Sequence, residues 1–187
     1  MPEATIPIIF ATSFVVALSG AMMPGPLLAV TIGESVRRGF WAGPLLILGH
    51  GILELGLVVA LALGVHQFIE SELISGIVGL IGGIILVVMG SVTIAGWRKA
   101  SIPTANSLGA VGGRRLVISG ILASVSNPYW FIWWLTLGTT YMVWSLQLGI
   151  AGIASFFSGH ILADLSWYAF ISALIATGRR VLNDTAY

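Results

Sequence analysis

A long apolar run from Ile6 to Glu34 contains Pro24-Gly25-Pro26 in its interior, and this combination limits what the chain can fold into. A run of this length indicates a membrane-spanning helix. Proline lacks an N–H and clashes with the preceding turn, and glycine adds backbone freedom, so a regular helix cannot pass through these residues. Broken helices in membranes commonly build binding sites. We therefore predict a break with a binding role, with a kink that serves only packing as the alternative.

The composition also indicates an integral membrane protein. The 187 residues are 57% hydrophobic and 8% charged, whereas soluble domains carry about 25% charged residues. The net charge of +1 excludes a strongly basic nucleic-acid binder, so we expect no nucleic acid partner. The chain has no cysteine, which excludes disulfides and thiol redox chemistry. The start, Met1-Pro2-Glu3, has no basic region, so we expect the first apolar run to stay in the mature protein.

We predict an all-α integral membrane protein with five transmembrane helices. A polar linker at 100–113, expected in the cytoplasm, separates the first three helices from the last two. The predicted spans cover residues 6–32, 41–65, 73–97, 116–142 and 148–177.

The positions of the basic residues predict the orientation. All eight follow the first or fifth span or lie between the third and fourth, which places them on one side of the membrane; they are Arg37, Arg38, Arg98, Lys99, Arg114, Arg115, Arg179 and Arg180. Cytoplasmic loops carry the excess of positive charge in membrane proteins. The N-terminus is then outside and Tyr187 is inside the cell.

The two parts of the chain repeat one pattern. The fourth span also contains a break, at Asn127-Pro128, and the span after each break carries Gly-His-x-x-x-acid, as Gly49-His50 with Glu54 and Gly159-His160 with Asp164. Three spans separate the two copies, so they start on opposite sides of the membrane. This pattern predicts an inverted repeat of residues 1–99 and 114–187. The helical rise places both breaks and both acids near the membrane midplane.

The two intramembrane acids are the strongest functional candidates. A charged side chain at the membrane centre costs about 2.5–3.5 kcal/mol, and helix packing does not require one. Burial disfavours the charged carboxylate, so Glu54 and Asp164 are candidates to hold protons reversibly. His50 and His160 lie four residues earlier on the same helix faces. We predict that these four residues couple protons to transport; a cation-binding role is the alternative.

The two breaks are the candidate substrate site. The half-helix that begins after each break presents free N–H groups that suit a carboxylate, and the freed carbonyls suit an ammonium group. A zwitterion such as an amino acid satisfies both. The candidate substrate-binding residues are Pro24, Gly25, Pro26, Asn127, Pro128 and Trp130. The aromatic side chains after the second break either wall this site or serve packing: Tyr129, Trp130, Trp133 and Trp134.

Over nearly its whole length the chain resembles the lysine exporter family of the LysE/RhtB type. The resemblance rests on three motifs: Gly20-x-x-x-Pro24-Gly25-Pro26, Arg38-Gly39-x-x-x-Gly43 followed by Gly49-His50, and Asn127-Pro128 followed by Gly159-His160-x-x-x-Asp164. It implies an exporter of amino acids or similar small metabolites, driven by the proton gradient, in a prokaryotic cell membrane. We expect no enzyme activity and no cofactor, and a homodimer is compatible with the glycine-rich third span.

The chain departs from the family in two ways. Members usually have a sixth hydrophobic segment, and they commonly carry a basic residue after the Asn-Pro pair, where this chain has Tyr129. Efflux of a divalent metal cation is the main alternative, because two histidines and two acids are plausible metal ligands. A hydrolytic enzyme would need a nucleophile beside a base, and Ser158 and Ser166 show no spacing that specifies one.

Overall fold

The computed structural model describes residues 5–65, 91 and 112–181, without the side chains of 65 and 179–181. These residues form helices and turns, with no strand in the described ranges. Nearly all of the predicted third span (73–97) and of the linker (100–113) lies outside the described residues, so the count of five spans remains a prediction.

The first predicted span is two helices. α1 (Ile6–Ala21) and α2 (Pro26–Arg38) meet at an angle of 76°. Proline stands in the first turn of both helices, where its missing N–H costs no intrahelical hydrogen bond. α2 ends at Gly39, whose φ of 76° is a conformation that favours glycine. α3 (Ala42–Ala60) follows and continues into the π-helical turn η1 (Leu61–Val65).

The second part of the chain also begins with two helices that meet at a bend. α6 (Gly113–Val125) is followed, after the predicted break, by α7 (Pro128–Trp133), the π-helical turn η3 (Trp134–Gly138) and α8 (Thr139–Leu146). The bend at this break is 65°. α9 (Gly149–Val181) is the longest described helix. Both predicted breaks are therefore present in the structure.

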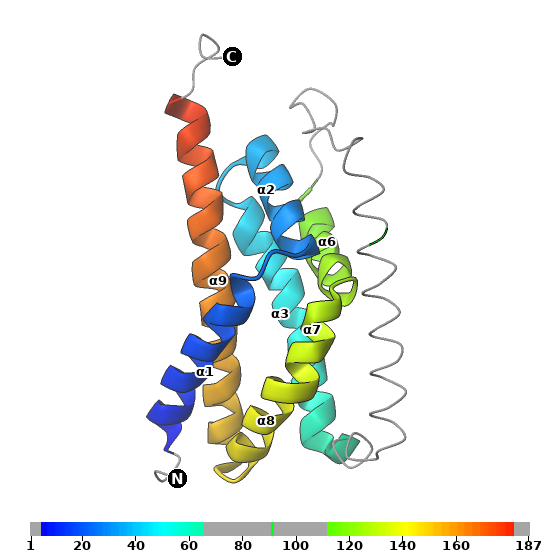
Figure 1. The fold of residues 1–187 in the computed structure, drawn as a ribbon, viewed down its shortest axis with the longest axis vertical. Coiled ribbons are helices and arrows are strands. Elements are labelled where there is room, and N and C mark those ends of the chain that lie inside the picture. Colours follow the sequence, from blue (N-terminus) through cyan, green and yellow to red (C-terminus); the bar gives the residue numbers. More distant parts are fainter. Residues whose placement is uncertain (1–4, 66–90, 92–111, 182–187) are drawn as a thin grey trace.

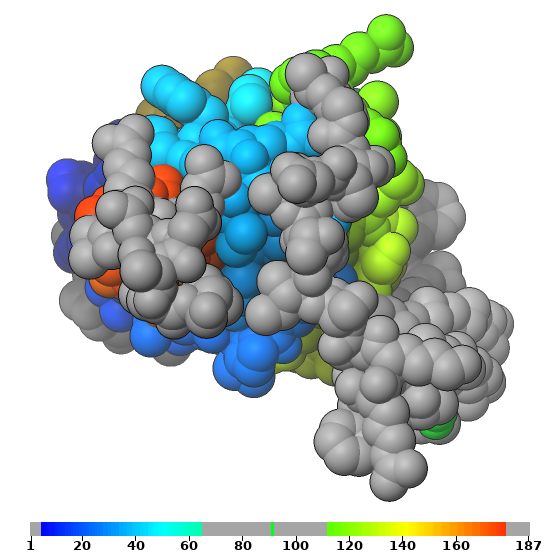
Figure 2. Space-filling view, turned by 90° about the horizontal axis from the view of Figure 1, so that it is seen from above, coloured from blue at the N-terminus to red at the C-terminus, as the bar shows by residue number. Residues whose placement is uncertain are grey.

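The helices pack across the two parts of the chain. In Figure 1, α1 rises from the lower end to mid-height, where the chain crosses to α2, while α6 descends from the upper end to its own break. The most extensive contacts join α1 to α9 and α3 to α6. The first helix of each part thus packs on the long helix of the other. Seen from the upper end, α2 and the start of α3 occupy the middle of the surface (Figure 2).

Glycines permit these close crossings. A Cβ atom at Gly49 of α3 would fall on the carbonyl oxygen of Val117 in α6, and one at Gly120 of α6 would fall on that of Leu46 in α3. On the other pair, Gly159 of α9 packs in the same way against the backbone of α1. Small residues that let two backbones approach are the usual means of packing helices in membranes, where the hydrophobic effect does not drive association.

The described helices fit a membrane. Ala42–Gly64 and Gly149–Gly178 are long and apolar enough to cross one, with mean hydropathies of 2.2 and 1.5, and each bent pair passes the same test, which gives up to four spans in the described ranges. Large apolar side chains lie on the outer surface, including Leu63 at 81% exposure and Ile150 at 85%. In Figure 1, α2 ends and α6 begins toward the same end of the bundle.

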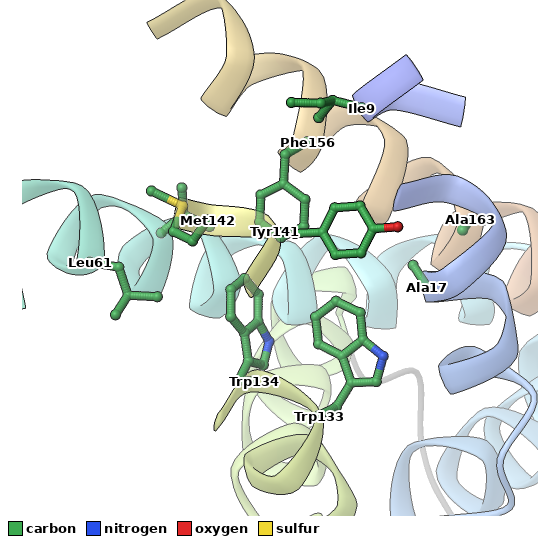
Figure 3. Packing of buried hydrophobic residues seen from close by; sticks show 10 residues of the cluster. Ile9, Ala17, Leu61, Trp133, Trp134, Tyr141, Met142, Phe156 and Ala163 are labelled. Carbon is green, nitrogen blue, oxygen red and sulfur yellow. The ribbon is translucent and has the colours of Figure 1, made fainter. Parts of the chain in front are cut away.

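An aromatic core fixes α7 and η3 against α9. Figure 3 shows Trp133 and Trp134 below the ring of Tyr141, with Phe156 of α9 beside it. The Tyr141 and Phe156 rings stack at a centroid distance of 5.8 Å, and Phe156 is fully buried. This packing gives both indoles defined orientations close to the centre of the bundle.

Substituting Gly49 tests the α3–α6 crossing. Gly49→Ala places a methyl group on the Val117 carbonyl, so we expect a loss of stability of about 1–3 kcal/mol, the usual cost of overpacking. Thermal unfolding of the purified protein in detergent measures it. Gly56→Ala on the same helix is the control, since its Cβ meets no atom within 4 Å, and it should be neutral or slightly stabilising. Equal effects of the two substitutions would contradict the close crossing.

Candidate functional site

The two histidines and two acids form one buried cluster, which we call the tetrad: His50, Glu54, His160 and Asp164. Nε2 of His50 lies 3.1 Å from Glu54 Oε1 and 3.4 Å from Asp164 Oδ2. Nε2 of His160 lies 2.9 Å from Glu54 Oε2 and 3.4 Å from Asp164 Oδ2. The four residues are at most 6% exposed. Each histidine therefore contacts the acid of its own helix and the acid of the other.

Two long helices bring these residues together. His50 and Glu54 stand one turn apart on α3, and His160 and Asp164 one turn apart on α9, so each pair shares one helix face. Gly51 keeps the two helices close, because a Cβ there would lie 2.9 Å from the Ile161 side chain. The sequence predicted the two pairs; the structure adds that they face one another.

Glu54 is held by two indoles as well. Trp134 Nε1 donates to Glu54 Oε1 at 2.8 Å and Trp130 Nε1 donates to the same atom at 3.0 Å. Glu54 is 1% exposed, and a buried carboxylate without such donors would be very costly. Charge-assisted hydrogen bonds are the strong ones in proteins, so these two donors offset part of the burial cost.

A hydrogen-bond chain orients His50. The Ser124 hydroxyl donates to the Gly120 carbonyl at 2.7 Å, so its oxygen accepts from the Nδ1–H of His50, also at 2.7 Å. Nε2 is therefore the nitrogen that His50 presents to the two carboxylates. This arrangement, in which one ring nitrogen is anchored and the other faces the site, fixes both the tautomer and the ring plane.

The two helix breaks meet beside the tetrad. A Cβ at Gly25 would lie 3.2 Å from the Asn127 Nδ2 atom, so the breaks are in direct contact. Asn127 Oδ1 accepts from the Tyr129 N–H at 3.1 Å and so caps α7. The second break therefore offers one free N–H fewer than the sequence predicts. The first turn of α2 has no such cap, because Gly25 has no side chain.

A small cavity joins the breaks to the tetrad. Its volume is about 50 Å³, room for roughly one or two water molecules but not for an amino acid. Besides the tetrad it is lined by residues of α1, α2, α6, α7 and α9, which are Ala17, Gly20, Ala21, Leu27, Ser124, Asn127, Tyr129, Trp130, Trp133 and Tyr168. A substrate of amino-acid size fits only after part of this wall moves.

Only some of the candidate substrate-binding residues line the cavity. Asn127 and Trp130 line the cavity, and Gly25 touches Asn127. Pro24, Pro26 and Pro128 do not line it. Trp130 donates its N–H to Glu54, a role that the sequence did not indicate.

Two functional contacts were missed by sequence reasoning. Ser124 was not singled out, although a hydroxyl three residues before Asn127 in an apolar helix was a usable signal. Trp134 was considered only as a cavity wall or a packing residue. No pattern in the sequence shows that its N–H reaches Glu54, because that contact depends on how η3 packs against α3.

The fold and the site together define a helical membrane protein in which two broken helices adjoin a buried cluster of ionisable side chains. The chain belongs to the LysE type translocator family, whose model matches residues 18–187. It is 24% identical over 177 residues to the "Putative amino acid efflux protein YcgF" of Bacillus subtilis (strain 168), an alignment that covers 94% of this chain and 84% of that protein. No solved structure matches the chain.

Replacing one indole tests the support of Glu54. Trp134→Phe removes a donor from a buried carboxylate, so we expect a loss of about 1.5–3 kcal/mol in unfolding free energy. Trp133→Phe is the matched control: Trp133 is equally buried on the same helical stretch, but its Nε1 has no hydrogen-bond partner among the described residues. Denaturation of both variants in detergent measures the difference. Similar losses would show that ring packing, and not the N–H, stabilises Glu54.

Proposed function

We propose that this translocator exports an amino acid or a similar small metabolite in exchange for protons. The observation that carries the proposal is the tetrad: two histidines and two acids from corresponding positions of α3 and α9 meet in one buried cluster next to the cavity. Structural packing of two apolar helices requires none of these side chains, and each is costly in a membrane. The name of the Bacillus subtilis relative supports the substrate class.

Charge balance gives the tetrad its coupling role. Two protonated histidines and two carboxylates have zero net charge, which a site of low dielectric favours. An ammonium group that approaches the carboxylates adds a positive charge, and this favours release of a proton from a neighbouring imidazole. Departure of the substrate restores the proton. Binding of the substrate and binding of the second proton are thereby mutually exclusive, as antiport requires.

The cavity has complementary groups for the two ends of a zwitterion. The uncapped first turn of α2 and the Asn127 amide are donors that suit a carboxylate. Glu54 and Asp164, on the other wall, suit an ammonium. The substrate then bridges the helix breaks and the tetrad, and the wall formed by Tyr129 and Trp133 moves outward to admit it.

The predicted inverted repeat provides the motion. α1 packs on α9 as α6 packs on α3, which is the exchange of partners expected for two halves related by a two-fold axis in the membrane plane. Rocking of the broken helices against α3 and α9 opens the cavity to either side in turn. In this arrangement the N-terminus is outside, and the end where α2 finishes with Arg37 and Arg38, uppermost in Figure 1, faces the cytoplasm.

Proton flux in proteoliposomes tests the proposal. Entry of an amino acid into the vesicles should drive protons out, so a trapped pH indicator reports alkalinisation. Glu54→Gln and Asp164→Asn should each abolish this signal, since an uncharged amide can neither stabilise an imidazolium nor attract the substrate ammonium. Glu34→Gln is the control: Glu34 pairs with Arg37 and Arg38 at the end of α2, and its loss should leave the flux unchanged.

Uptake of labelled substrate, measured in parallel, separates the two parts of the proposal. An acidic lumen should drive accumulation, and a protonophore should collapse it. Substrate accumulation that does not depend on the pH gradient would refute proton antiport but would still support amino-acid transport. The absence of transport for every common amino acid would refute the substrate class.

Asn127 tests the placement of the substrate carboxylate. Asn127→Asp keeps an oxygen that caps α7 but replaces the Nδ2 donor with a negative charge, so we expect KM to rise by at least tenfold with little loss of stability. Asn127→Ser also keeps a capping oxygen but adds no charge, and should have the smaller effect. Measured KM values for uptake decide this; equal values for the two variants would place the carboxylate elsewhere.

A further inference from the structure

We propose that the tetrad also binds one divalent transition-metal ion, of which Zn²⁺ and Co²⁺ are the probes of choice. The inference goes beyond the exporter function and does not depend on it, because it concerns binding to the resting protein. His50, Glu54, His160 and Asp164 each offer one ligand atom, and these atoms lie within 4.8 Å of one another.

The distances suit tetrahedral coordination. An ion with nitrogen and oxygen ligands at about 2.0–2.1 Å holds neighbouring ligand atoms roughly 3.3–3.4 Å apart. Both histidine Nε2 atoms lie 3.4 Å from Asp164 Oδ2, and they lie 3.1 and 2.9 Å from the two Glu54 oxygens. The four ligand atoms spread over up to 4.8 Å, so the most distant of them must close by about an ångström or slightly more to hold one ion.

The directions of these groups also favour a shared ion over pairwise hydrogen bonds. Glu54 Oε2, His160 Nε2 and Asp164 Oδ2 are fully buried and have no aligned hydrogen-bond partner among the described residues, although they approach one another closely. Buried polar atoms are nearly always hydrogen-bonded, so such a group needs an explanation. A common cation satisfies all three atoms at once.

The surroundings already resemble a metal site. Metal-binding histidines usually anchor their second nitrogen on a neighbouring group, and the Nδ1 of His50 is anchored on Ser124. Ligating carboxylates are likewise held by donors, and Glu54 Oε1 accepts from the indoles of Trp130 and Trp134, which leaves Oε2 for the ion. The supporting contacts of His50 and Glu54 are thus in place, whereas the Nδ1 of His160 has no hydrogen-bond partner among the described residues.

Charge and ligand type select the ion. Two carboxylates carry a charge of −2, which balances the +2 charge of a divalent ion. Two neutral imidazoles add no charge, so the loaded site has zero net charge inside the bundle. Two nitrogens and two oxygens suit Zn²⁺, Co²⁺ and Ni²⁺, whereas Mg²⁺ and Ca²⁺ prefer oxygen ligands alone. We therefore expect transition metals to bind and Mg²⁺ not to compete.

Cobalt spectroscopy tests the site. The full chain, purified through a tag that contains no histidine, should bind one Co²⁺ and develop the intense visible absorption of four-coordinate cobalt, which Zn²⁺ then abolishes. His160→Gln and Asp164→Asn should each lose this absorption. His66→Ala removes the remaining histidine, which lies outside the described residues, and should leave the spectrum unchanged. Circular dichroism and gel filtration confirm that each variant is folded.

X-ray absorption of the zinc-loaded, unaltered protein provides a test that needs no variant. The proposal requires a first shell of nitrogen and oxygen with two imidazole rings. A first shell without imidazole would overturn the proposal. So would the weak absorption of six-coordinate cobalt, or Co²⁺ binding that survives in both His50→Gln and His160→Gln.

Discussion

The buried carboxylate of Glu54 is the constraint on which the rest of the described structure depends. Glu54 is 1% exposed in a protein with an apolar exterior, and an unpaired charge in that position would be prohibitively costly. Its neutralisation requires groups from three places: His50 of its own helix, His160 of α9, and the indoles that α7 and η3 supply. The contacts that neutralise the Glu54 carboxylate therefore fix the relative positions of α3, α9 and the second broken helix.

The glycines and the helix breaks make that convergence geometrically feasible. Gly49 and Gly120 let α3 and α6 cross with backbone in contact, and this brings Ser124 within hydrogen-bond distance of His50. The bend after Val125 then turns α7 inward, so that two successive turns of an aromatic helix present their N–H groups to Glu54. An unbroken helix would carry those indoles away from the bundle centre.

Much of this arrangement was predictable, because the costly features of a membrane protein are visible in its sequence. Proline in an apolar run predicted both breaks, and the spacing of His50 to Glu54 and of His160 to Asp164 predicted two polar faces. What the sequence does not contain is the pairing between helices. The i, i+4 rule relates residues of one helix and says nothing about which face meets which, so the convergence of the two pairs on one point appears only in the fold.

The capping of α7 shows a second limit of the same kind. The sequence predicts Asn127 as a substrate-binding residue and free N–H groups at the start of the half-helix that follows it. In the structure the Asn127 oxygen accepts from the Tyr129 N–H, so the two features partly satisfy each other. Asparagine is a preferred capping residue, and local capping competes with any ligand for the same donors. The uncapped start of α2 is the better candidate for an anionic group.

Electroneutrality links the proposed occupants of the tetrad. Two carboxylates in a site shielded from water require about two positive charges, and these can be two protons on His50 and His160, one divalent ion, or a substrate ammonium together with a single proton. The ammonium needs the carboxylate oxygens and the protons occupy the histidine nitrogens, while the ion needs both, so each change of occupant displaces at least one positive charge. Exchange transport requires that one occupant leaves when the other binds. The tetrad meets this condition, because two carboxylates with no positive partner and a tetrad with excess positive charge are both high in energy. The same condition implies that a tightly held metal ion would arrest the cycle, because it leaves neither a proton to release nor a carboxylate for the substrate.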